Sequence, residues 1–239
     1  MGRLILVRHG QASFLSDDYD RLSERGLEQS RLLGQFWSRN GVAFSRAISG
    51  PRRRHQETAG AVVAAYGDAG VAFPEVEVAP ALDEFDWDGL MQYASLHLLK
   101  AHPRLLELHG VLQHAVDNAA RRRAIQKYME ALMALWVRGE FESSTIESWP
   151  EFCARVYGAI AELTAEADSG ANVVVFTSGG TAAVVVQRAL DHASEKTLEL
   201  IWTLRNGALV EFLFTRERFS LGSFNDVPHL PDPAYWTYR

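Results

Sequence analysis

The sequence predicts a three-layer α/β/α sandwich around a mostly parallel sheet, because two kinds of segment alternate along the chain. Short β-branched and aliphatic runs, such as residues 4–7 and 172–176, have the length of buried strands. Polar turns separate them from longer segments in which apolar residues recur at helical spacing. Residues 90–147 are rich in Leu, His and Arg, and predict a helical cap inserted into a single domain spanning residues 1–239.

The first strand and helix occupy the start of the chain. Residues 4–7 (LILV) form the predicted strand, and Ser23 is placed to cap a helix over residues 24–39. Asn40 and Gly41 follow, and both residue types favour helix ends. The first unit is therefore a strand followed by an amphipathic helix.

A second strand and helix come next. Residues 47–49 predict a short strand that meets a Gly-Pro turn, and the polar run 52–58 opens a helix that ends near Tyr66. Val76–Val78 alternates enough to predict a further strand. An acidic loop, residues 83–89, follows that strand.

The predicted cap is divided at Pro103, Gly110 and Gly139, which interrupt its helical pattern. Residues 149–167 then predict one more amphipathic helix. The apolar content of the cap suits packing on the core, covering an apolar leaving group, or forming a homodimer interface. The oligomeric state is left open.

The last predicted elements surround the strongest strand signal. Residues 172–176 (NVVVF) are followed by Ser178, Gly179 and Gly180, where another helix starts. Residues 208–214 (ALVEFLF) predict the last strand, and the Pro-rich tail shows no helical pattern.

Composition excludes several classes of protein. The 24 Lys+Arg and 30 Asp+Glu give a formal charge of −6, whereas general nucleic-acid binders carry a net basic surface. Cys153 is the only cysteine, so neither an intramolecular disulfide nor a Cys-based zinc cluster can form. We expect no nucleic-acid partner and a cytoplasmic location.

No segment has the character of a signal peptide or a membrane span. The apolar run 4–7 is too short for a signal-peptide core. The longest uninterrupted apolar stretch, residues 131–137, is far below the ~18 residues that span a bilayer. We expect a soluble protein without a membrane partner.

Polar clusters follow four of the predicted strands. Arg8 and His9 follow the first strand, Arg52 to Arg54 the second, Glu84 the third, and Ser178 the fourth. The carboxyl ends of parallel strands share one edge, so these groups should converge. Each cluster could instead have a purely structural role. His9 could be a hydrogen-bonded structural histidine, and residues 52–54 could be the solvated start of a helix. Together, arginines, an imidazole and a carboxyl group suit phosphoryl transfer.

Metal sites are considered and not expected. The acidic loop from Glu84 imitates the start of a calcium loop, but its twelfth position is Ser95 and lacks the bidentate Glu. Asp86 and Asp88 are accordingly expected to be solvated loop residues. The cap histidines form no helical i, i+4 pair for a metal, and are expected to be surface or packing residues: His97, His102, His109 and His114.

A serine hydrolase is an alternative, because Ser178 stands where a strand turns into a helix, as the nucleophile of an α/β-hydrolase does. The first glycine of the G-x-S-x-G pattern is lacking. His192 and His229 lie downstream as possible bases, with Asp191 and Asp226 as possible orienting acids.

The triplet Arg8, His9 and Gly10 after the first strand resembles the signature of the histidine phosphatase superfamily, which has the phosphoglycerate-mutase-like fold. The resemblance covers roughly residues 3–89 and 147–214. Further matching positions lie in the first helix, the second-arginine motif and the acid loop: Leu22, Ser23, Gly26, Gln29 and Gly34; Ser49, Arg54, Thr58 and Ala59; and residues 82–89.

The resemblance implies a role for each matching residue. His9 would be the nucleophile that becomes phosphohistidine, Arg8 and Arg54 would clamp the phosphoryl oxygens, and Glu84 would act as general acid and later as base. No metal or organic cofactor would be required. Further contacts to a small phosphorylated substrate are expected from Gln11, Ser13 and Gly179.

One departure from the family pattern concerns the late strand, which usually ends in a second histidine before Gly. Ser178 occupies that position here. A hydroxyl lacks the charge-assisted hydrogen bond of an imidazolium, and losing one such donor costs on the order of 10²- to 10³-fold in rate. Compensation would have to come from Arg52, Arg53, His55, or the backbone N–H groups of Gly179 and Gly180. A smaller departure is the Gln11-Ala12 pair after the triplet.

The sequence therefore predicts a phosphomonoester hydrolase that works through phospho-His9, with a rate attenuated by Ser178. Three alternatives stay open: a phosphoglycerate-type mutase, a catalytically silent domain that binds a phospho-ligand or a partner, and the serine hydrolase built on Ser178. The identity of the phosphomonoester is not predicted.

Overall fold

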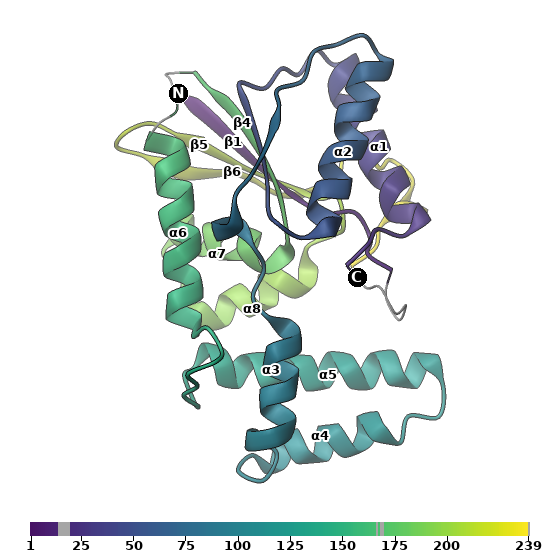
Figure 1. Cartoon of the computed structure of the whole chain (residues 1–239), viewed down its shortest axis with the longest axis vertical. Coiled ribbons are helices and arrows are strands. Elements are labelled where there is room, and N and C mark those ends of the chain that lie inside the picture. Colours follow the sequence, from purple (N-terminus) through teal and green to yellow (C-terminus); the bar gives the residue numbers. More distant parts are fainter. Residues whose placement is uncertain (14–19, 166, 168–169, 239) are drawn as a thin grey trace.

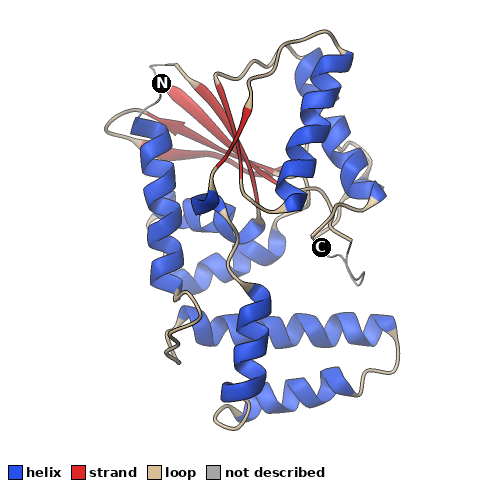
Figure 2. Cartoon of the chain, in the orientation of Figure 1, coloured by secondary structure: helices blue, strands red, loops and turns tan. Residues whose placement is uncertain are grey.

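A computed structural model describes residues 1–13, 20–165, 167 and 170–238. Its described residues form a six-stranded sheet in the order β3-β2-β4-β1-β5-β6, with helices on both faces (Figures 1 and 2). The strands are β1 (Gly2–Arg8), β2 (Arg46–Ser49), β3 (Val76–Val78), β4 (Asn172–Thr177), β5 (Leu209–Phe214) and β6 (Phe219–Asp226).

The sheet is mostly parallel, as predicted. The pairs β3-β2, β2-β4 and β4-β1 are parallel, whereas β1-β5 and β5-β6 are antiparallel. Residues 208–214 predict a strand, and β5 confirms it. That this strand is the last one is wrong, because β6 follows and pairs with β5. The pairing of β5 with β6 shifts register between Leu209 and Phe212, and such an irregularity breaks the regular alternation that identifies a strand in a sequence.

Alternate residues of β1 point to opposite layers. Ile5 and Val7 pack with the core under α1 (Glu24–Arg39) and α2 (Arg53–Asp68). Leu4 and Leu6 join the core on the other face, where α6 (Trp149–Ala165), α7 (Gly179–Leu190) and α8 (Ser194–Thr203) lie. This period of two follows from strand geometry and gives the three layers that the sequence predicts.

Local signals set the ends of the first helix as expected. The Ser23 hydroxyl accepts a hydrogen bond from the Gly26 backbone N–H, and Asn40 stands at the C-terminal end. Gly41 follows with φ of +66°, a left-handed conformation that glycine adopts without strain. The helix predicted over 149–167 ends at Ala165, and residue 166 lies outside the described residues.

The cap lies at one end of the molecule, beyond the sheet (Figure 1). It consists of α3 (Trp87–Tyr93), a π-helical turn (Ala94–Leu98), α4 (Pro103–Gln113) and α5 (Asn118–Val137). Pro103 begins α4 as predicted, but the interruption expected at Gly110 is wrong. A glycine inside a helix costs only ~1 kcal/mol, and Leu105 and Leu108 of α4 are buried in the main core, so packing outweighs this cost.

The acidic loop is shorter than expected. A 3₁₀ turn (Pro80–Leu82) precedes it, and the Asp86 carboxylate accepts a hydrogen bond from the Gly89 backbone N–H at the start of α3. Asp88 lies in the first turn of that helix. Both side chains are exposed, and Asp86 lies at the end of the loop, as expected, where it also caps α3. Asp88 is a helical residue, which corrects its expected placement in the loop.

Among the helices that the structure describes, none is both long enough and apolar enough to span a bilayer.

Candidate active site

The carboxyl ends of β1, β2 and β4 lie side by side. Arg8 pairs with Thr177 across the β1-β4 ladder, and Ser49 pairs with Phe176 across the β2-β4 ladder. The polar clusters that follow these strands therefore meet, as the topology predicts. They line one cavity of about 540 Å³, whose polar end is formed by Arg8, His9, Arg52, Arg54, Glu84, Gly179 and Gly180.

His9 is held in one orientation by the backbone. Its Nδ1 lies 2.7 Å from the Gly10 carbonyl oxygen, which can only accept, so Nδ1 carries the proton and Nε2 keeps its lone pair. The ring is 5% exposed. Burial, with the positive charges of Arg54 and Arg8, holds the pKa of His9 well below its usual range. The imidazole is thus neutral at physiological pH, with its Nε2 lone pair unprotonated.

Gly10 allows the backbone after β1 to lie against the first helix. A Cβ at this position would stand 2.3 Å from the Gly26 carbonyl oxygen, a collision that backbone movement alone could relieve. The Gly10 N–H also donates to the Thr58 hydroxyl at 3.1 Å. The glycine of the triplet therefore fixes where His9 sits relative to α1 and α2.

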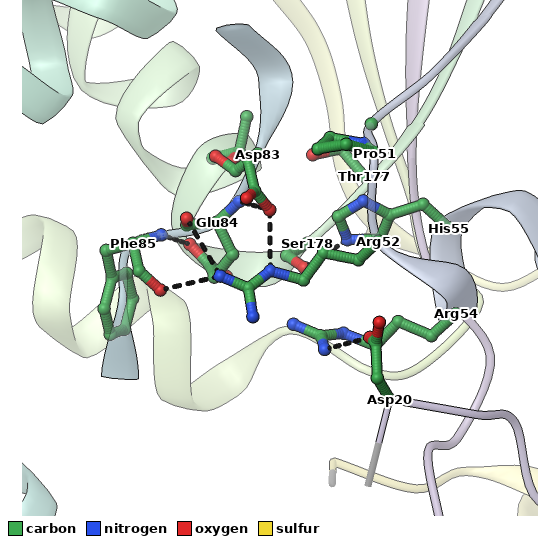
Figure 3. Close-up of polar contacts among 12 residues, drawn as sticks. Asp20, Pro51, Arg52, Arg54, His55, Asp83, Glu84, Phe85, Thr177 and Ser178 are labelled. Atoms are coloured by element: carbon green, nitrogen blue, oxygen red, sulfur yellow. Dashed lines mark hydrogen bonds and ion pairs between the residues drawn. The ribbon is translucent and has the colours of Figure 1, made fainter. Parts of the chain in front are cut away.

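Arg54, in the first turn of α2, lines the cavity. It is 5% exposed, and its Nη1 donates to the Asp20 carboxylate at 2.6 Å (Figure 3). The second Asp20 oxygen accepts from the Arg53 backbone N–H at 2.9 Å. Asp20 was not predicted as a site residue, since a single acid before a helix cap carries no pattern. An anion that enters the cavity competes with this carboxylate for Arg54.

Arg8 is oriented by two backbone carbonyls. Its guanidinium donates to the carbonyl oxygen of Leu204 and, at 2.9 Å, to that of Tyr238. Tyr238 belongs to the C-terminal tail, and it also lines the cavity. Because the tail is far from Arg8 in sequence and has no periodic pattern, its contribution was not predicted.

Glu84 faces the start of α7. One carboxylate oxygen accepts from the Gly180 N–H at 2.8 Å, and the other from the Phe85 N–H at 3.2 Å. Loss of hydration around the carboxyl raises the pKa of Glu84, although these hydrogen bonds and the charges of Arg54 and Arg52 oppose the rise. A carboxyl group with a raised pKa is suited to donate a proton.

The loop that carries Glu84 is anchored from several elements. Arg52 donates to the Asp83 carboxylate at 2.6 Å, and its other nitrogen reaches the carbonyls of Glu84 and Phe85 at 3.4 Å (Figure 3). The Thr177 hydroxyl donates to the Leu82 carbonyl at 2.8 Å. Arg52 is therefore used to position the acid loop, although it also lines the cavity.

Ser178 meets His55 behind the cavity. The Ser178 hydroxyl oxygen lies 2.5 Å from His55 Nε2, and the two residues are 1% and 0% exposed. The ring centres of His55 and His9 are 5.8 Å apart. Burial and the charges of Arg54 and Arg52 hold the pKa of His55 well below its usual range. Of the groups considered as compensation for Ser178, His55 is the one placed against it.

Arg53 and the Gly180 N–H, which are two of the other such groups, are engaged elsewhere. Arg53 forms an ion pair with Glu57 at 2.7 Å on the exposed side of α2, and the Gly180 N–H bonds Glu84. The bases considered for a serine hydrolase also lie elsewhere: His192 Nδ1 bonds the Ala193 carbonyl, and His229 packs beside Gly207.

Gly179 lines the cavity, whereas Gln11 and Ser13 are absent from its described lining. The Gln11 backbone N–H donates to the Gln29 side chain at 2.8 Å, and its side-chain oxygen accepts from Ser23. The Ser13 N–H donates to the Arg21 carbonyl at 2.9 Å. Both residues thus join the chain after β1 to the start of α1.

Three of the four cap histidines make packing or capping contacts, and the fourth, His102, stands at the N-terminal end of α4 without a side-chain capping bond. The His97 ring packs on Tyr93, and the His109 ring on Tyr128. His114 Nδ1 bonds the Gly110 carbonyl at the end of α4. Within the described residues, no three His, Cys, Asp or Glu side chains gather as a metal site would require.

Comparison with solved structures supports the fold. A putative alpha-ribazole-5'-P phosphatase from Escherichia coli K-12 is 18% identical, with a TM-score of 0.64, and the match covers 95% of this chain and 98% of that one. A phosphoserine phosphatase from Entamoeba histolytica, in complex with 3-phosphoglyceric acid, is 18% identical with a TM-score of 0.63, covering 96% and 100%. A phosphoglycerate mutase from Bacillus anthracis is 18% identical with a TM-score of 0.59, covering 95% and 94%.

At these identities the structural matches establish the fold, which phosphatases and a mutase share. No curated protein sequence matches the chain. The family model for branch 1 of the histidine phosphatase superfamily matches residues 4–118 and 99–227. Most of the chain, including the strand ends that carry Arg8, His9, Arg54 and Glu84, falls within these ranges. The chain belongs to the histidine phosphatase superfamily, branch 1.

Proposed function

We propose that this protein is a phosphomonoester hydrolase that works through a phosphohistidine intermediate on His9. The observation that carries the proposal is a shared cavity in which a neutral, oriented imidazole faces the same space as Arg8, Arg54 and a carboxyl group with a raised pKa. These groups supply a nucleophile, two cations for phosphoryl oxygens, and a proton donor.

In the first half-reaction, His9 Nε2 attacks phosphorus while Arg8 and Arg54 bind the equatorial oxygens. The N–P bond forms as the P–O bond to the alcohol breaks, and Glu84 gives its proton to the departing alkoxide. In the second half-reaction, water attacks phosphorus and Glu84 takes its proton. The N–P bond then breaks, phosphate leaves, and both His9 and Glu84 return to their starting states.

Two features are expected to slow this cycle. Ser178 offers a hydroxyl where relatives with a second histidine offer a charged donor, and its hydrogen bond to His55 is the closest substitute in this chain. The Asp20 carboxylate competes with the phosphoryl group for Arg54. We therefore expect a turnover number below that of a family member with two histidines, by on the order of 10²- to 10³-fold.

The test is phosphate release from a panel of phosphomonoesters that includes an activated aryl phosphate, with wild type, His9→Ala and Ser178→Ala compared between about pH 5 and 8. Turnover that His9→Ala abolishes and Ser178→Ala largely keeps supports the proposal. Labelling of Ser178 by a fluorophosphonate, with turnover lost in Ser178→Ala instead, would establish the serine hydrolase. Movement of the phosphoryl group to another hydroxyl of the same substrate, without release of phosphate, would establish a mutase.

Background release from all three proteins would overturn the enzymatic proposal. Binding of phosphate or vanadate in that case would establish a silent binding domain. Each alternative thus has a result that distinguishes it from the hydrolase.

A further inference from the structure

The cavity at His9 is much larger than a phosphoryl group needs. Its volume is about 540 Å³, within the range of roughly 300 to 1,000 Å³ that holds whole organic ligands. Arg8, His9, Arg54 and Glu84 occupy one end of it. The remaining space extends between the catalytic groups, the cap and α8, where the alcohol portion of a phosphomonoester would lie.

The part of the cavity lining that faces this remaining space, called the wall below, is built mainly from apolar side chains. They come from four helices, α3, α4, α5 and α8, and include Met91, Leu112, Ile125, Met129, Ile201 and Trp202. The polar residues of the cap that also line the cavity are Asp88, Gln113 and Arg121, and all three are exposed. Their side chains are therefore largely hydrated, whereas the six apolar side chains are half-buried or buried.

Helix α5 shows how the wall differs from ordinary core packing. Tyr128 and Leu132 of this helix are fully buried in the main hydrophobic core. Ile125 and Met129 are only half-buried and line the cavity instead. They are four residues apart, so they lie on one face of the helix. One face of α5 thus stabilises the fold, and a neighbouring face presents hydrocarbon and thioether groups to the cavity.

We propose that this wall binds the alcohol portion of the substrate and that this alcohol is apolar. The substrate is then a monophosphate ester of an aliphatic or aryl alcohol, rather than a phosphorylated sugar or polyol. This inference rests on the proposed hydrolase function, because it assigns the leaving group of that reaction.

The chemistry of the wall decides between these two classes. Each hydroxyl of a sugar or polyol loses its hydration on entry, and the thioether and aliphatic groups of Met91, Ile125 and Met129 offer it no comparable hydrogen bond. Each methylene of an apolar alcohol gains free energy when it leaves water for such a surface, equivalent to about a fourfold change in affinity.

The experiment uses the full chain and a series of n-alkyl phosphates from ethyl to octyl, with glycerol 1-phosphate matched against propyl phosphate. The intrinsic reactivity of these esters is nearly constant, so a change in kcat/KM reports contact with the leaving group. We expect kcat/KM to rise up to about fourfold per methylene until the cavity is filled. Propyl phosphate should exceed glycerol 1-phosphate by at least tenfold.

Two variants on α5 locate the effect. Ile125→Asn places an amide in the wall, and should reduce kcat/KM for octyl phosphate by about tenfold while leaving that for ethyl phosphate nearly unchanged. Lys127→Asn introduces the same residue at an exposed position of the same helix that is outside the described lining. The Lys127→Asn variant should have the same kcat/KM as wild type for every ester of the series.

Binding of the matching n-alkylphosphonates, measured by calorimetry, separates this inference from the proposed function. Affinity that rises with chain length supports the apolar site even if no ester is turned over, in which case the hydrolase proposal alone fails. A flat series, in affinity or in kcat/KM, or a preference for glycerol 1-phosphate, would overturn the apolar site while leaving the hydrolase intact.

Discussion

Gly180 gives the sharpest test of Glu84 as the proton donor. A Cβ at Gly180 would lie 2.2 Å from a Glu84 carboxylate oxygen and 2.9 Å from the Phe85 ring, whereas real Cβ contacts are essentially never shorter than 3.0 Å. In Gly180→Ala the carboxyl must therefore retreat by at least about 0.8 Å. A misplacement of about 1 Å can reduce a catalytic rate by on the order of 10²-fold.

The loss should depend on the leaving group. An alkyl alkoxide needs a proton as it departs, whereas 4-nitrophenolate does not, so Gly180→Ala should lower kcat/KM for an alkyl phosphate by about 10²-fold and kcat/KM for 4-nitrophenyl phosphate by less than about fivefold. The ratio kcat/KM reports only the steps up to departure of the leaving group, so the later action of Glu84 as a base does not enter it. The assay is steady-state phosphate release on both esters, with thermal unfolding as a check on folding.

Gly179→Ala is the matched control on the same helix turn. Its Cβ would lie 3.4 Å from Arg8 Nε, an ordinary van der Waals contact, and it does not meet Glu84. Any loss in this variant should be the same for both esters. If Gly180→Ala lowers kcat/KM for both esters equally, the assignment of Glu84 as general acid is refuted.

Three further predictions concern neighbouring groups. Asp20→Asn removes the carboxylate that competes for Arg54 while keeping an acceptor for the Arg53 N–H. Inhibition by inorganic phosphate should therefore strengthen by about three- to tenfold. Weaker inhibition would contradict the competition between Asp20 and phosphate for Arg54. Ser178→Ala should remove the hydrogen bond between Ser178 and His55 Nε2. It should lower the free energy of unfolding, measured by urea titration, by about 1–3 kcal/mol. An unchanged free energy of unfolding would indicate that this hydrogen bond contributes nothing to stability. Burial lowers the pKa of His229 to about 3, so its unfolded form takes up a proton below its usual pKa of 6.5 and stability falls as pH decreases from there. His229→Gln should reduce this slope by about 1.2 kcal/mol per pH unit between pH 6 and 5, and an equal slope in both proteins would refute it.

The sequence predicted most of the sheet because its parallel strands carry a local signal. Residues 4–7 and 172–176 are continuous apolar runs, as expected for strands covered by helices on both faces. β6 was missed because its register irregularity interrupts the alternation and most of its residues are only half-buried. Gly110 was misjudged because the sequence shows a helix-breaking residue but not the burial of Leu105 and Leu108 around it.

The site was predictable where it follows from topology. Arg8, His9, Arg54 and Glu84 converge because they follow strands that pair in parallel at one edge of the sheet. The contributions of Asp20 and Tyr238 were not predictable, since each depends on a long-range contact with an arginine that no spacing records. The Ser178–His55 contact is of the same kind, because 123 residues separate its partners.

The most direct test of the proposed mechanism is to trap the intermediate. Wild type mixed with an activated aryl phosphate and quenched in alkali should carry one phosphoryl group on the peptide that contains His9, stable in base and lost in acid, as expected for a phosphoramidate. His9→Ala should carry none. A wild type that turns over the ester without any phosphopeptide at His9, or an equally labelled His9→Ala, would contradict the account.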